Sequence, residues 1–132
     1  MPAIAELLEL AREAAKSAYA PFSNFRVGAA VSAGGNIFTG CNIENASFGL
    51  TICAERVAIF KAVSTGVRKI DAIAVACIDA PLHGNKDSLM PCGACRQVMA
   101  EFAEGGLPVV VDRAGDFTLE RLLPSAFRLP QT

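Results

Sequence analysis

The sequence predicts an α/β fold in which a mixed sheet is flanked by helices, and two observations predict it. Segments with helical and with strand periodicity follow one another in the order helix, strand, strand, helix, strand, helix, strand, helix. The strand expected over residues 70–78 is apolar on both of its sides, which is typical of a central strand covered by helices. Each strand–helix–strand passage favours a parallel, right-handed crossover, so the fold class is α/β.

The first elements expected are a helix and a hairpin. Apolar residues recur at helical spacing from Ile4 to Tyr19, with charged residues between them, and predict an amphipathic helix. A break over residues 20–24 ends this helix. Strands are expected over residues 25–33 and 36–42. Because Gly34-Gly35 between them is a two-residue hairpin signal, we expect these strands to be antiparallel neighbours.

The rest of the chain continues the alternation of helices and strands. The expected elements are a helix over 53–65 before Gly66, the central strand over 70–78, a polar loop over 79–90, a helix over 92–104 before Gly105-Gly106, a strand over 107–112 and a short helix over 118–123. A chain of 132 residues has the length of one domain, so we expect residues 1–132 to fold as a single unit.

Charge and hydropathy exclude several classes of protein. With 12 Lys and Arg against 13 Asp and Glu, the net charge is −1, so the chain has no basic surface for long nucleic acid. Glu6 and Glu9 interrupt the start of the chain, and polar residues interrupt its longest uncharged run, 27–43, so neither a secretory signal nor a membrane span is expected. We therefore expect a cytoplasmic protein. Its mean hydropathy of +0.39 favours an oligomer, because one small core does not absorb that much apolar surface.

Three of the five cysteines have the spacing of a metal site. Cys92 and Cys95 stand three residues apart at the start of a predicted helix, and Cys53 opens another helix. Residues i and i+3 share one helix face, so both thiolates can reach one tetrahedral zinc ion, and helix N-termini favour thiolates. Three protein ligands leave a fourth position open, as in catalytic zinc sites. The predicted cofactor is one Zn²⁺ per chain, whereas Cys41 and Cys77 are expected to pack in the core.

The residues after Cys53 supply the other groups of a hydrolytic centre. Glu55 is too close to Cys53 in sequence to bind the same ion easily, but its carboxylate can carry protons beside a water at the open position. Zinc deaminases in general combine such a metal site with a glutamate that is not a ligand. Arg56 is the expected hydrogen-bond donor to a ligand sulfur, and Arg96 is a second candidate for that role.

Six motifs spread over nearly the whole chain carry a resemblance to a known family. They are Tyr19–Ser23 (YAPFS), Phe25–Ala30 (FRVGAA), Gly40–Ala46 (GCNIENA), Cys53–Arg56 (CAER), Pro91–Gln97 (PCGACRQ) and Leu122–Phe127 (LLPSAF). In these motifs the chain resembles the short, homotetrameric-type zinc cytidine deaminases. The resemblance implies a three-layer fold whose mixed sheet has about five strands flanked by helices. It also implies hydrolytic deamination of cytidine and deoxycytidine to uridine and deoxyuridine plus ammonia, a reaction of pyrimidine salvage.

By the same resemblance, Glu55 shuttles protons, first from water to N3 of the pyrimidine and then to the departing amine. The implied substrate contacts are Phe25 on the pyrimidine ring, Asn42 and Glu44 at the ribose 3′-hydroxyl, and backbone groups near Ala54 and residues 91–92 at the base edge. Phe127 is implied to reach into the active site of a neighbouring subunit, so that the homotetramer shares its active sites.

The chain departs from its relatives at two places: Phe48 stands where many of them have a tyrosine, and the loop from residue 79 to 92 is several residues longer. A longer loop beside the metal helix can change which nucleoside is preferred. One alternative is therefore a deaminase of a modified cytosine nucleoside, as in the blasticidin-type deaminases. Another alternative, from a different class, is an interaction module with a structural zinc site, in which His83 joins the three cysteines as fourth ligand.

Overall fold

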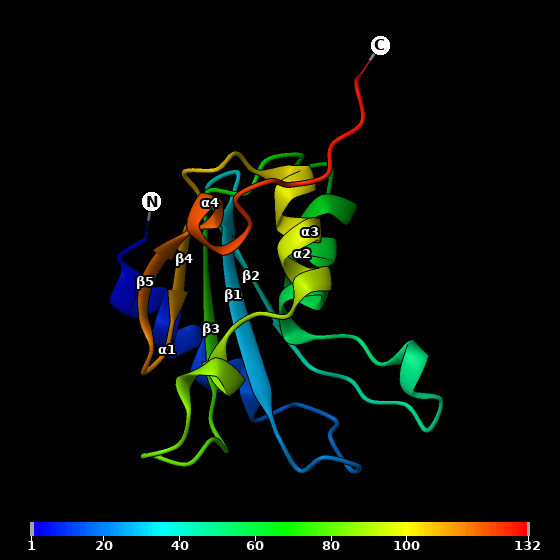
Figure 1. The fold of residues 1–132 in the computed structure, drawn as a ribbon, viewed down its shortest axis with the longest axis vertical. Helices are drawn as coiled ribbons and strands as arrows, with labels where there is room; N and C mark the ends of the chain where they lie inside the picture. Colours follow the sequence, from blue (N-terminus) through cyan, green and yellow to red (C-terminus); the bar gives the residue numbers. More distant parts are fainter. Residues whose placement is uncertain (1, 132) are drawn as a thin grey trace.

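Five strands form one mixed sheet between two layers of helices (Figure 1). The computed structural model describes residues 2–131. The elements in chain order are α1 (Ile4–Ala15), β1 (Val27–Ala33), β2 (Asn36–Cys41), the 3₁₀ turn η1 (Phe48–Leu50), α2 (Ala54–Ser64), β3 (Ala72–Cys77), the 3₁₀ turn η2 (Lys86–Leu89), α3 (Gly93–Phe102), β4 (Pro108–Val111), β5 (Gly115–Thr118) and α4 (Leu119–Leu122). The strand order across the sheet is β2-β1-β3-β4-β5.

The strand pairing confirms the predicted hairpin and the predicted central strand. β1 pairs in antiparallel orientation with β2 on one side and β3 on the other, and β3 pairs in parallel with β4. Gly34 and Gly35 have φ angles of 57° and 79°, the left-handed conformation that tight hairpin turns require. β3 is the middle strand. The strands β3 and β4, which α3 connects, are parallel neighbours as expected. The strands β2 and β3, which α2 connects, run in the same direction but are not neighbours, because β1 lies between them.

Helix α1 covers one face of the sheet, and α2, α3 and α4 cover the other (Figure 1). The helix α1 lies directly on β1 at Gly28, where a Cβ atom would stand 1.9 Å from the Ala11 carbonyl oxygen. α2 lies as closely on β2 at Gly40, where a Cβ atom would stand 2.6 Å from the Ala58 nitrogen. Because α2 packs so tightly against β2, the sheet fixes the position of the N-terminal turn of α2.

The first helix ends four residues earlier than predicted, at Ala15 rather than Tyr19. Tyr19 is instead drawn into an extended pairing with Ile43: its N–H donates to the Asn42 carbonyl, and its own carbonyl accepts from the Glu44 N–H. The other predicted elements keep their places and are shorter by one or two residues at their ends. Within residues 2–131, no helix combines the length and the apolar character needed to cross a membrane.

The residue pattern does not predict strand β5, although the family resemblance implies a fifth strand. Its sequence, GDFT, lacks apolar alternation, and it pairs with β4 as an edge strand with its first two residues exposed. The turn between β4 and β5 contains Arg113, which has a φ of 66°. A non-glycine residue in this left-handed region is uncommon, so the turn is held by contacts elsewhere in the fold.

Candidate active site

The N-termini of α2 and α3 meet and bring three thiols together. Cys53 is the N-cap of α2, Cys92 is the N-cap of α3, and Cys95 lies in the first turn of α3. The Sγ atoms of Cys53 and Cys92 are 3.7 Å apart, and those of Cys92 and Cys95 are 3.4 Å apart. All three sulfur atoms lie within 4.8 Å of one another. The structure therefore brings together the three cysteines that the sequence predicts as ligands.

This donor set fits a zinc ion. In a tetrahedral thiolate site with Zn–S distances of about 2.3 Å, neighbouring sulfur atoms stand about 3.8 Å apart. The observed separations are close to that value. Within the described part of the chain, 2–131, no other group of three or more metal-binding side chains is found, and His83 is not a member of this one. The alternative of a four-ligand structural site thus lacks its fourth ligand.

Arg56 lies beside the thiols, as predicted. Its Nη2 donates a hydrogen bond to the Cys53 sulfur at 3.5 Å. Contact with the Cys95 thiol, helped by hydrogen bonds from Arg56 and Cys92, lowers the pKa of Cys53 to about 5. The pKa of Cys95 is raised, because its proton is shared with the Cys53 sulfur and because the side chain is buried. The contacts within the cluster and with Arg56 therefore favour the thiolate form of Cys53.

Arg96, the second candidate for contact with a sulfur, does not have that role. Its Nε donates to the Pro91 carbonyl at 2.8 Å, and its Nη1 donates to the Leu122 carbonyl at 2.7 Å. Arg96 thus fastens the start of α3 to the end of α4. The guanidinium of Arg96 is not directed at a sulfur because these two main-chain carbonyls take its hydrogen bonds.

An Arg56→Gln variant is expected to bind zinc and to react about 10- to 100-fold less efficiently, because groups that hydrogen-bond metal ligands commonly have effects of this size. The loss arises because the Cys53 sulfur keeps its charge but loses its cationic partner. Zinc affinity and kcat/KM as a function of pH measure the effect. Arg68→Gln, which removes an arginine bonded only to carbonyls, is the control. An Arg56→Gln enzyme with unchanged zinc affinity and pH profile would contradict this role.

A cavity of about 160 Å³ opens beside the thiol cluster. It is lined by the side chains or backbone of Phe25, Val27, Asn42, Thr51, Cys53, Ala54, Glu55, Val75, Cys77, Ser88, Leu89, Met90 and Cys92. Glu55, only 4% exposed, lies on the wall of this cavity, which Cys53 and Cys92 also line. Burial raises the pKa of Glu55 to about 7, and the negative charge on Cys53 acts in the same direction. A carboxyl group with this pKa can both take up and release a proton near neutral pH.

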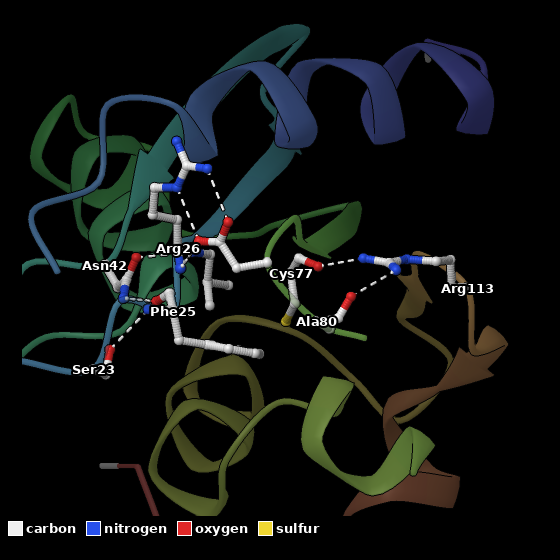
Figure 2. Close-up of polar contacts among 9 residues, drawn as sticks. Ser23, Phe25, Arg26, Asn42, Cys77, Ala80 and Arg113 are labelled. Atoms are coloured by element: carbon white, nitrogen blue, oxygen red, sulfur yellow. Dashed lines mark hydrogen bonds and ion pairs between the residues drawn. The ribbon is translucent and has the colours of Figure 1, made fainter. Parts of the chain in front are cut away.

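Asn42 and Phe25 also line this cavity, and the structure shows how they are connected (Figure 2). The Asn42 Oδ1 accepts from the Val27 N–H at 2.9 Å, and its Nδ2 donates to the Phe25 carbonyl at 2.8 Å. The buried amide of Asn42 therefore holds the backbone on both sides of residue 26. This contact places the Phe25 ring at the cavity, a positioning role that the sequence did not indicate.

Glu44 lies outside this cavity, in an adjoining cleft of about 420 Å³. The cleft is lined by Phe22, Ser23, Glu44, Phe48 and Thr51, and Thr51 lines both spaces. The Glu44 carboxylate accepts from the hydroxyl and N–H groups of Ser23 and from the N–H of Phe22. The Ser23 hydroxyl and these two N–H groups lower the pKa of Glu44, which keeps its negative charge in the cleft.

Phe127 does not line the cavity of its own chain, and its side chain is 67% exposed. Sequence reasoning missed seven lining residues: Val27, Thr51, Val75, Cys77, Ser88, Leu89 and Met90. Cys77 is buried, as expected of a core cysteine, and burial raises its pKa to about 12, but it also faces the cavity. Its position at the end of the central strand, where ligand sites of α/β sheets commonly lie, is the signal that points to it.

The comparison with known proteins agrees with this geometry. Residues 1–110 match the family described as the cytidine and deoxycytidylate deaminase zinc-binding region. The chain belongs to this family. Its similarity to a cytidine deaminase from Sporosarcina psychrophila is 46% identity over 129 residues, which cover 94% of this chain and 90% of that one. A cytidine deaminase from Halalkalibacterium halodurans is 47% identical over 126 residues, with 92% and 91% of the two chains covered.

Solved structures of the family have the same fold. The cytidine deaminase from Burkholderia pseudomallei superimposes with a TM-score of 0.84 at 44% identity, over 96% of this chain and all of that one. The cytidine deaminase from Mycobacterium tuberculosis gives a TM-score of 0.83 at 38% identity, over 98% of this chain and 100% of that one. These comparisons confirm the predicted α/β fold and the predicted enzyme class, a hydrolase of the cytidine deaminase type. They also confirm the zinc cofactor that the three cysteines hold.

Proposed function

We propose that this protein converts cytidine and deoxycytidine to uridine and deoxyuridine by hydrolysis, as an enzyme of cytoplasmic pyrimidine salvage. The observation that carries the proposal is a buried glutamate, Glu55, on the wall of a cavity that the three-cysteine cluster also lines. In the reaction, a water oxygen forms a bond to C4 of the base, the C4–N bond breaks, and ammonia leaves. Each molecule of substrate therefore consumes one molecule of water.

Zinc held by Cys53, Cys92 and Cys95 would supply Lewis-acid activation of the water. Glu55 takes the proton that the water loses, delivers it to N3 of the pyrimidine, and later protonates the departing amine. Its pKa near 7 and its place on the cavity wall that Cys53 and Cys92 also line support both the uptake and the release of a proton. Arg56 balances the charge of the Cys53 thiolate, and the Phe25 ring and the Ala54 backbone hold the base against this end of the cavity.

The two connected spaces support a nucleoside as substrate. The cavity beside the cysteines is smaller than the 300–1,000 Å³ typical of pockets for whole ligands, so it has room for the base, and the ribose extends past Thr51 into the neighbouring cleft. Asn42 lines the cavity and Glu44 the cleft, which suits contacts to the sugar hydroxyls. Among the described residues that line either space, none is Lys or Arg. The phosphate of a nucleotide would therefore face the Glu44 carboxylate with no positively charged side chain to bind it.

The test is a set of steady-state assays in which ammonia release is measured with cytidine, deoxycytidine, deoxycytidine monophosphate and a blasticidin-type nucleoside. We expect kcat/KM to be highest for the two plain nucleosides and at least 100-fold lower for the monophosphate. A protein that deaminates only the modified nucleoside would support the alternative substrate class. A protein that releases no ammonia from any of the four would contradict the proposal.

We further propose that the protein acts as a homotetramer with shared active sites. Phe127 and Leu129 near the C-terminus and Phe48 beside the cleft are large apolar side chains that are each at least two-thirds exposed. Gln97 donates from Nε2 to the Phe127 carbonyl at 2.8 Å, which anchors this exposed segment to α3. An aromatic ring held outside the cavity of its own chain is well suited to close the cavity of another copy.

A Phe127→Ala variant is expected to lower kcat/KM about 10- to 100-fold without loss of zinc, because stacking of an aromatic ring on a base is worth roughly 1–3 kcal/mol. If the active site is shared, refolding a mixture of Phe127→Ala and Glu55→Ala chains forms some sites with both residues intact. The mixture should then exceed the summed activities of the two separate variants. A verified mixed oligomer without such a gain, or a fully active monomer by light scattering, would contradict the shared site.

A further inference from the structure

The far end of the loop between β3 and α3 forms one wall of the active-site cavity. Ser88, Leu89 and Met90 all line the cavity, and the Leu89 side chain is buried. The Cys77 thiol, at the end of β3, contacts the Leu89 carbonyl at 3.9 Å. The loop therefore leaves the sheet at Cys77 and returns to nearly the same place before α3 begins. The shape of this wall depends on how firmly the start of the loop is held.

Arg113 holds the start of the loop from the turn between β4 and β5 (Figure 2). Its Nη2 donates to the Cys77 carbonyl at 2.6 Å, and its Nη1 donates to the Ala80 carbonyl at 3.1 Å. The guanidinium thus bridges the last residue of β3 and the loop that follows it. The backbone of Arg113 has a φ of 66°, where glycine or asparagine is the usual residue. Position 113 therefore carries an arginine although the backbone conformation at this position favours a smaller residue.

Asp79 provides a second attachment of the same part of the loop. Its carboxylate accepts three hydrogen bonds from Arg26, from the backbone N–H at 2.8 Å, from Nε at 2.9 Å and from Nη2 at 2.8 Å. These bonds lower the pKa of Asp79 to about 2, so the pair stays charged at neutral pH. Arg26 lies between Phe25 and Val27, which both line the cavity. The start of the loop is therefore also tied to the segment that carries these two lining residues.

We propose that Arg113 is a positioning residue for the deamination reaction, which holds the loop over residues 79–91 so that Ser88 to Met90 complete the wall of the cavity. This inference rests on the proposed function. When the loop is released, only a fraction of the molecules has a complete wall, and the apparent affinity for substrate falls by that fraction. Glu55 and the three cysteines lie at the N-termini of α2 and α3, whereas the two carbonyls that Arg113 bonds belong to β3 and the loop after it. Loss of Arg113 therefore raises KM and leaves kcat nearly unchanged.

The decisive variant is Arg113→Gly. Glycine adopts a φ of 66° without strain, so this variant keeps the turn and the fold while it removes the side chain that carries the guanidinium. We expect its KM for cytidine to rise about tenfold and its kcat to stay within twofold, as for a change in the fraction of binding-competent molecules. Arg113→Lys, which can donate to one carbonyl at a time, should give an intermediate KM. Arg68→Met removes an arginine that donates to the Val63 and Val67 carbonyls at the C-terminal end of α2, and should leave KM unchanged.

Amide hydrogen exchange of the same proteins provides a readout that does not depend on catalysis. In Arg113→Gly, the peptides covering residues 79–91 should exchange at least tenfold faster than in the unmodified protein, while those of α2 should not change. An active unmodified enzyme whose Arg113→Gly variant keeps its KM and its exchange rates would overturn the inference. So would a variant in which kcat falls and KM does not. Absence of deamination in the unmodified protein itself would instead overturn the proposed function.

Discussion

Replacing Glu55 with alanine is expected to lower kcat for cytidine by roughly 10²- to 10⁴-fold, while zinc content and fold are retained. General acid–base groups contribute about this much to catalysis, and Glu55 serves more than one proton transfer in the proposed reaction, so the upper end of the range is expected. None of the metal ligands is removed. Steady-state kinetics, zinc analysis and thermal unfolding of the purified variant provide the measurement.

Glu55→Gln is the matched variant for this prediction. Glutamine keeps the size of the side chain and remains able to form hydrogen bonds, but it cannot carry a proton, so its loss of kcat should be similar to that of the alanine variant. A glutamine variant with substantial activity would assign Glu55 to substrate binding rather than to proton transfer. An alanine variant that retains a tenth of the original kcat would remove Glu55 from the catalytic mechanism altogether.

The parts of the fold that the sequence predicts correctly are those with local signals. The antiparallel hairpin follows from two adjacent glycines that both adopt a positive φ, and the central strand follows from a run of residues that is apolar on both sides. The starts of α2 and α3 follow from the cysteine motifs, since Cys53 and Cys92 have the extended backbone of N-caps. In each case, the conformation depends on residues close together in the chain.

The features that the sequence does not predict depend on contacts between distant residues. The helix periodicity continues to Tyr19, but pairing with Ile43, 24 positions further along, ends α1 early. The contact of Arg113 with the Cys77 and Ala80 carbonyls spans more than thirty residues and leaves no pattern in the sequence around it. Strand β5 is short and exposed at its start, so its hydrogen bonds to β4, rather than its own composition, define it.

The candidate site shows the same division. The spacing of Cys92 and Cys95 predicts that they share a helix face, and the structure confirms it. The meeting of Cys53 with this pair depends on the packing of α2 beside α3 and is predicted only by the family motifs. Likewise, the motif that contains Asn42 and Glu44 does not reveal that these two residues line two different spaces.

Removal of zinc is expected to abolish the reaction, because the remaining residues bind and orient the substrate but supply no Lewis acid. Treatment with a chelator should reduce zinc from one ion per chain to none, remove the activity, and lower the melting temperature, since an ion that binds only the folded protein stabilises it. Activity should return when zinc is added back. The binding should also weaken at low pH, because protons compete with the metal for the cysteine sulfurs.

A Cys92→Ser variant tests the same site without a chelator. Cys92 is an exposed N-cap of α3, and serine is among the preferred N-cap residues, so the helix should remain intact while zinc affinity and activity fall at least 100-fold. Cys41→Ser, a cysteine outside the cluster, is the matched control and should keep one zinc ion and full activity. Retention of zinc and activity in Cys92→Ser would show that this sulfur is not a ligand. If Cys41→Ser also lost zinc, zinc binding would depend on cysteines outside the cluster as well as on those within it.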